Sequence, residues 1–149
     1  GPGFYLFNLE HTAHSPHYYY HKFDPEDEKS HRRSIYRFVV RSQPNPFMTT
    51  LDCADSSQST PKRNETLTAL QALSLLNNKF TLVMARHFAD RLAGEEEKIT
   101  RQVGIGFELV AGRPPSAEEQ NLLAEYASKH GMANLCRSLF SLSEFAFID

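Results

Sequence analysis

Four histidines near the start of the chain have a spacing that suits metal binding. Steps of three, three and four residues separate the members of this set, which are His11, His14, His17 and His21. On a helix, these steps would place the imidazoles on one face, as a metal site requires. Pro16 interrupts such a helix, and Ser15 before it favours a turn. The alternatives are therefore a polar surface loop and a transition-metal site at His14, His17 and His21.

A second candidate group combines carboxylates, arginines and an amide. Its members are Arg41, Asp52, Asp55, Arg63 and Gln71. Carboxylates near an arginine could bind a polar ligand or a cation, or serve as acid and base. They could equally form a buried ion-pair network that pins a loop to the helices. Gln71 lies among leucines, where an amide is typically buried and bonded to nearby backbone, or else lines a site.

The overall charge limits the classes of partner. The 149 residues include 16 basic and 18 acidic side chains, for a net charge of −2. This balance argues against a nucleic-acid-binding surface, which needs clustered positive charge. A basic cluster between residues 32 and 41 is therefore better interpreted as a solvated face or as a docking surface for another domain. Its members are Arg32, Arg33, Arg37 and Arg41.

Other global features are ordinary for a globular domain. Hydrophobic residues make up 40% of the chain, and no apolar run approaches the roughly 20 residues of a membrane span. No signal peptide begins the sequence. The two cysteines, Cys53 and Cys136, could form one disulfide or remain two buried thiols.

Residues 64–143 have the periodicity of successive helices. The predicted helices cover 65–76, 79–93, 95–111, 116–130 and 132–142. Thr60-Pro61 indicates the start of the first helix, and Gly94 and Gly112 indicate the ends of the second and third. Ser116 and Glu119 have the spacing of a capping box at the start of the fourth. The predicted core positions are Leu70, Leu73, Leu76, Phe80, Val83, Met84, Phe88, Leu92, Ile99, Val103, Phe107, Val110, Leu122, Leu123, Tyr126, Leu135, Leu139 and Leu142.

Residues 1–63 have a weaker pattern. Ser34–Arg41 fits a helix stripe through Ile35, Phe38 and Val39, or a strand face through Tyr36, Phe38 and Val40. We favour the helix. The fold predicted is all-α, an irregular bundle of about five to six helices with a long loop-rich N-terminal arm. A short two-stranded piece near Ile35–Leu51 is compatible with it. We expect one domain over 1–149, with the arm and first element in 1–63 and the bundle in 64–149.

A series of short motifs runs along the chain. Residues 32–36 read RRSIY, 51–55 LDCAD, 59–63 STPKR, 68–77 TALQALSLLN, 112–119 GRPPSAEE, 133–140 ANLCRSLF and 143–145 SEF. Their order resembles the domain-of-unknown-function family 1553, which is abundant in planctomycetes and related bacteria. Ala54, Ala69 and Ser143 depart from that family's usual Pro, Pro and Asn, and residues 8–31 carry none of its motifs.

The resemblance implies a setting more than a chemistry. Members of the family are typically the C-terminal domain of long exported proteins, so the resemblance implies a fragment of such a protein and a periplasmic or extracellular location. Upstream lie a cytochrome-c-like domain and a second domain of unknown function, which would be this chain's partners. Any heme would belong to the upstream part, because the Cys-x-x-Cys-His attachment motif is missing here.

Three hypotheses for function follow. The first is a structural or interaction domain of an exported, cytochrome-linked multidomain protein, since the chain shows no catalytic signature. The second is a contribution to a redox or polysaccharide-related enzyme site completed by upstream domains, with the loop from Asp52 to Arg63 lining the cleft. The third is metal binding through the histidine-rich arm.

Overall fold

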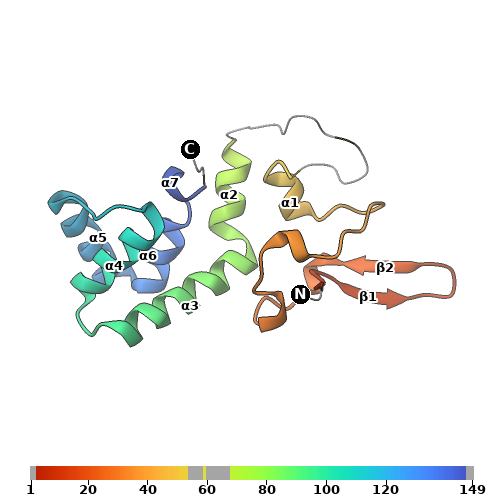
Figure 1. Ribbon diagram of the computed structural model, residues 1–149, viewed down its shortest axis with the longest axis horizontal. Helices are drawn as coiled ribbons and strands as arrows, with labels where there is room; N and C mark the ends of the chain where they lie inside the picture. The colour runs from red at the N-terminus through yellow and green to blue at the C-terminus, as the bar shows by residue number, and fades with distance from the viewer. Residues whose placement is uncertain (1–2, 54–58, 60–67, 147–149) are drawn as a thin grey trace. The chain divides into compact units, whose positions relative to one another are not determined.

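Helices make up most of the computed structural model, which describes residues 3–53, 59 and 68–146 (Figure 1). The described α-helices are α1 Pro46–Thr50, α2 Ala69–Asn77, α3 Lys79–Glu95, α4 Ile99–Ala111, α5 Ala117–His130, α6 Met132–Leu139 and α7 Ser143–Ala146. One two-stranded antiparallel sheet joins β1 Asn8–His11 to β2 Pro16–Tyr19. The chain divides into two compact units, residues 1–71 and 72–149. The mainly helical class predicted from the sequence is confirmed.

The first unit begins with a β-hairpin where the sequence predicts a loop. Asn8 pairs with Tyr19, and His11 pairs with Pro16 at the turn end of the hairpin. The Thr12 amide and hydroxyl both donate to the Ser15 carbonyl, which closes the turn. The short two-stranded piece therefore exists, but it lies at residues 8–19 and not near Ile35–Leu51. The hairpin escapes prediction because its strands carry few β-branched residues, and ring contacts such as Phe7 with Tyr18, 5.1 Å between centroids, support it.

The helix predicted over Ser34–Arg41 is wrong. Only a single 3₁₀ turn forms, at Ser34–Tyr36, and the chain then extends. The Phe4 amide donates to the Tyr36 carbonyl at 3.2 Å, and the Phe38 amide donates to the Phe4 carbonyl at 2.7 Å. Pairing with a segment more than thirty residues earlier in the chain thus replaces the local helical bonds, and it leaves Ile35 79% exposed.

The helix boundaries follow the sequence with four corrections. α2 begins at Ala69, because Thr68 is not helical, and α6 ends at Leu139 and not at Leu142. α3 continues through Gly94 to Glu95, so Gly94 does not end it. α4 begins at Ile99 and not at Glu95, because Glu96 adopts an extended conformation. The Gln102 side-chain amide donates to the Glu96 carbonyl at 2.6 Å and fixes this connection.

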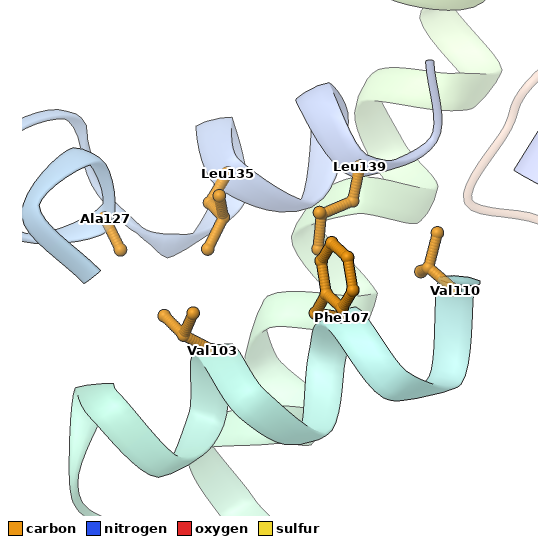
Figure 2. Close-up of a cluster of buried hydrophobic side chains, with 6 residues drawn as sticks. All are labelled: Val103, Phe107, Val110, Ala127, Leu135 and Leu139. Atoms are coloured by element: carbon orange, nitrogen blue, oxygen red, sulfur yellow. The ribbon is translucent and has the colours of Figure 1, made fainter. Parts of the chain in front are cut away.

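The core of the second unit lies where α4, α5 and α6 meet (Figure 2). Figure 2 shows its six buried side chains, which are Val103, Phe107, Val110, Ala127, Leu135 and Leu139. A second buried cluster joins α3 to α6 through Ala85, Ala89, Leu92 and Cys136. No helix among the described residues is long and apolar enough to cross a bilayer.

Most predicted core positions of α4 and α6 are buried, whereas on α3 Val83 and Leu92 are buried and Phe80, Met84 and Phe88 are half-buried. The exposed exceptions lie on α2, α4 and α5. Leu70 and Leu73 of α2 are exposed, Gln71 between them is buried, and Ile99 at the start of α4 is exposed. On α5, Leu122 is 66% exposed, and Tyr126 is also exposed. Periodicity identifies an apolar stripe, but the neighbouring helices decide which edge of it is covered. The predicted start at Thr60-Pro61 lies outside the described residues.

The difference in burial between Leu135 and Leu122 can be tested by substitution. We expect Leu135→Ala to lower the free energy of unfolding by about 2–5 kcal/mol, because it removes a fully buried side chain and leaves a cavity. Leu122→Ala should change the free energy of unfolding by less than about 0.5 kcal/mol. Urea denaturation followed by circular dichroism measures both. A loss in Leu122→Ala equal to that in Leu135→Ala would contradict the burial assigned to α5.

Candidate functional site

Asp52 occupies a constrained position at the end of α1. Its φ of 54° lies in the left-handed region, which Asp and Asn tolerate better than most residues. The Asp52 amide donates to the Thr49 carbonyl at 3.2 Å, and the Cys53 amide donates to the Met48 carbonyl at 3.0 Å. This is the Schellman pattern that closes a helix C-terminus. The backbone role of Asp52 is therefore set by the short helix before it.

Gln71 connects Asp52 to the start of α2. The Gln71 amide nitrogen Nε2 donates to Asp52 Oδ2 at 2.8 Å. The Gln71 oxygen Oε1 accepts from the Thr68 backbone amide, and Thr68 Oγ1 accepts from the Gln71 backbone amide. The last two bonds form a capping box, which satisfies amides that a helix start leaves open. The buried Gln71 side chain thus caps one helix and binds the end of another.

The remaining members of the predicted polar group are not brought to this pair. Arg41 is exposed in the turn after Val40 and forms no ion pair with a described residue. Asp55 and Arg63 lie outside the described residues. Of the five candidates, the structure joins Asp52 and Gln71. The role of the group in a ligand site or an enzyme site stays a prediction.

The histidines of the arm are distributed along the hairpin. His11 ends β1, His14 lies in the turn, His17 is on β2, and His21 is in the 3₁₀ turn Tyr20–Lys22. His17 stacks on Tyr19 with centroids 6.2 Å apart, and His21 meets the edge of the same ring at 5.6 Å. Among the described parts of the chain, no three His, Cys, Asp or Glu side chains are grouped so as to hold a metal ion. Metal binding through His14, His17 and His21 stays a prediction.

Both cysteines are free thiols. Cys136 is fully buried, and burial raises the pKa of its thiol to about 12. Because the thiolate is the nucleophilic form, this thiol is unsuited to covalent chemistry near neutral pH. Cys53 is half-buried and accepts a hydrogen bond from Arg37 Nη2 at 3.3 Å.

The motif GRPPSAEE forms the turn between α4 and α5. Gly112 has a φ of 71°, as a residue that ends a helix in the left-handed region requires. Ser116 and Glu119 form the predicted capping box. Arg113 donates to both Glu119 oxygens, at 2.9 and 2.8 Å. The Arg113 hydrogen bond, followed by that from the Ser116 amide, lowers the pKa of Glu119 from 4.5 to about 2.

Arg137 of α6 holds the C-terminal end of α2. Its Nε donates to the Leu76 carbonyl at 2.6 Å, and its Nη2 donates to Asn77 Oδ1 at 2.8 Å. The last carbonyls of a helix lack partners within it, and a cation there also favours the helix dipole. Two motifs that lie 60 residues apart, LLN and NLCR, therefore meet in one contact.

A pocket of about 400 Å³ opens between α3 and α6. Apolar atoms come from Leu82, Val83, Ala85 and Ala133, and polar groups come from Lys79, Arg86, Asn134 and Arg137. Sequence reasoning missed this pocket, because its two walls lie about fifty residues apart and neither has a ligand motif. It also missed the capping box of Thr68 and Gln71, although the Thr-x-x-Gln pattern was readable.

Comparison with known proteins gives a family but no relative of described function. A family model named PSD1, described as a protein of unknown function (DUF1553), matches residues 5–127. No curated protein and no solved structure matches the chain.

The Asp52 turn can be tested by substitution. Asp52→Ala should raise the exchange rate of the Asp52 and Cys53 amides roughly tenfold to a hundredfold, because Ala is strained at positive φ and cannot accept from Gln71. Asn tolerates positive φ and its side-chain oxygen can still accept from Gln71, so Asp52→Asn should change the amide exchange rates less. Hydrogen exchange by nuclear magnetic resonance measures the two variants. Equal exchange rates in Asp52→Ala and in the unmodified chain would contradict this role.

The Glu119 contact makes stability depend on pH. Its carboxylate is more acidic in the folded chain, so its stabilising effect is complete above pH 4.5 and disappears as the pH falls towards about 2. We expect the melting temperature of the unmodified chain to fall more steeply over this range than that of Glu119→Gln. Glu118→Gln, at the neighbouring exposed position, is the matched control. A control variant that flattens the pH profile as much as Glu119→Gln would rule out this assignment.

Proposed function

The chain belongs to the PSD1 family of proteins of unknown function (DUF1553), and we propose that it is a non-enzymatic interaction domain of an exported, cytochrome-linked multidomain protein. The export and the cytochrome link rest on the family resemblance. The interaction role rests on the surface of the first unit, where large apolar side chains remain exposed.

The first unit buries little apolar surface of its own. Among its described residues, the buried large hydrophobic side chains are Phe4, Phe7 and Val40, together with Pro25. A unit of about 70 residues normally needs a larger core, or another stabilising element, to be stable alone. The ion pair between Lys22 and Glu10 joins two largely exposed side chains, and such pairs contribute little stability. Further burial against another domain would supply what is missing.

Apart from Leu9 on β1 and Leu70 on α2, the exposed large apolar side chains described in the first unit lie on two paired segments. We call these residues the apolar face; they are Tyr5, Ile35, Tyr36, Phe38 and Val39. The hydrogen bonds of Phe4 place the two segments side by side, and the rings of Tyr5 and Phe38 are 5.3 Å apart. Exposed apolar side chains on adjoining segments, with Tyr5 and Phe38 in contact, are typical of protein–protein contact sites. The apolar face is the observation that carries the proposal.

Cations flank the apolar face. Arg33 is exposed in the same segment, and the Arg32 guanidinium lies over the Tyr36 ring, 4.8 Å from its centroid. Interfaces are typically enriched in aromatic and Arg side chains, with a polar rim around the apolar centre. The composition of this segment therefore suits a partner domain with acidic groups at the border of an apolar patch.

Surface labelling tests the proposal. The 149-residue chain and the longer polypeptide that carries it are each exposed to hydroxyl radicals, and modification of Tyr5 and Phe38 is measured by mass spectrometry. We expect modification of these rings to fall at least severalfold in the longer polypeptide, because another domain covers the apolar face. Tyr126, an exposed ring on α5, is the internal control and should be labelled equally in both.

Substitution completes the test. Tyr5→Ser with Phe38→Ser should weaken the domain contact and restore hydrogen exchange of residues 35–39 in the longer polypeptide to the rate seen in the 149-residue chain. Leu122→Ser, a comparably exposed leucine on α5, is the matched control and should have no such effect. Equal labelling of Tyr5 and Phe38 in the two polypeptides would refute the proposal.

A further inference from the structure

The pocket between α3 and α6 carries an inference that is independent of the interaction role, because it concerns the second unit alone. We propose that this pocket is a binding site for a small organic anion, a molecule with one carboxylate or similar group on an apolar body. The argument rests on the shape of the pocket, on its apolar floor and on the sign of the charges around it.

Short side chains create the space. Ala85 on α3 and Ala133 on α6 line the pocket, and Ala85 is 1% exposed. Leu82 and Val83 add apolar atoms from α3. The volume of about 400 Å³ lies in the range of small-molecule sites, which runs from about 300 to 1,000 Å³. The apolar body of a small ligand therefore has a matching surface.

Among the described residues, the charged groups that line the pocket are all cationic. They are Lys79, Arg86 and Arg137, although the chain as a whole has a net charge of −2. Arg86 takes part in other interactions, so the inference rests on the other two. Charge complementarity favours an anion, because the two cations beside a partly apolar cleft raise the local positive potential.

Lys79 and Arg137 differ in how they are held. Arg137 is fixed by bonds to the Leu76 carbonyl and to the Asn77 side-chain oxygen, which are neutral acceptors that leave its charge uncompensated. Lys79 is exposed and forms no ion pair with a described residue. One cation is thus positioned in advance, and the other is an exposed side chain that has no ion pair with a described residue.

Helix direction adds to the same potential. Lys79 and Leu82 lie in the first turn of the 17-residue helix α3. Ala133 and Asn134 lie in the first turn of α6, whereas Arg137 lies in its last turn. Helix N-terminal ends carry partial positive charge. The Asn134 amide donates to the His130 carbonyl, which orients its side chain at the start of α6.

The experiment compares three probes by nuclear magnetic resonance. Phenylacetate carries an anion on an apolar ring, phenylacetamide is its neutral analogue, and sodium sulfate is an anion without an apolar body. We expect phenylacetate to shift the backbone amides of residues 79–86 and 133–137 saturably, with the other two probes at least about tenfold weaker. The proposal would be overturned if phenylacetamide or sulfate bound as tightly as phenylacetate. It would also be overturned if phenylacetate caused no saturable shift.

Variants locate the site. Lys79→Gln should weaken phenylacetate binding about tenfold, because it removes the exposed Lys79 ammonium group that would pair with the carboxylate. Leu82→Glu should abolish binding, since it places a carboxylate at the apolar wall. Lys129→Gln on α5 is the matched control and should bind phenylacetate like the unmodified chain. Unchanged affinity in Lys79→Gln, or equal loss in Lys129→Gln, would show that the anion binds elsewhere.

Discussion

The close approach of α3 and α4 at Gly106 is the constraint on which the second unit depends. A Cβ atom at Gly106 would lie 2.9 Å from Leu92 Cδ1, so the Leu92 side chain would have to shift to make room for it. Glycine therefore allows the fully buried Leu92 to lie directly against the α4 backbone. Leu92 also packs with Ala85, Ala89 and Cys136, and through them α3 reaches α6. The same packing sets the floor of the pocket, to which Ala85 contributes.

Motif residues of the family resemblance act mainly at the ends of helices. Gln71 caps α2 and binds Asp52 after α1, Arg137 closes the other end of α2, and Glu119 caps α5 while binding Arg113. Each contact satisfies backbone groups that a helix terminus leaves open, or fixes a turn between helices. Of the polar residues that suggested a site from the sequence, Asp52 and Gln71 have such structural contacts. The α3–α6 pocket is lined by residues outside that group.

The two units are stabilised by different kinds of apolar contact. The second unit has two connected clusters of buried side chains, and Phe88 packs against both. The first unit relies on ring contacts around Phe7, which meets Tyr5, Tyr18 and Phe38 at centroid distances of 5.1–6.2 Å. Aromatic pairs add roughly 0.5–1.5 kcal/mol each beyond burial, which partly offsets a small core. The apolar face of the first unit is the surface left over after those contacts.

Local physical rules determined what the sequence could predict by itself. Helical periodicity identified α3, α4, α5 and α6, the capping box located Ser116 and Glu119, and the order of motifs identified the family. Whether Leu122 or Ala127 faces inward, and that Ser34–Arg41 extends beside Phe4, depended on partners distant in the sequence. Only the tertiary structure brought Arg137 to Asn77 and formed the α3–α6 pocket, because contacts across 50–60 residues leave no local pattern.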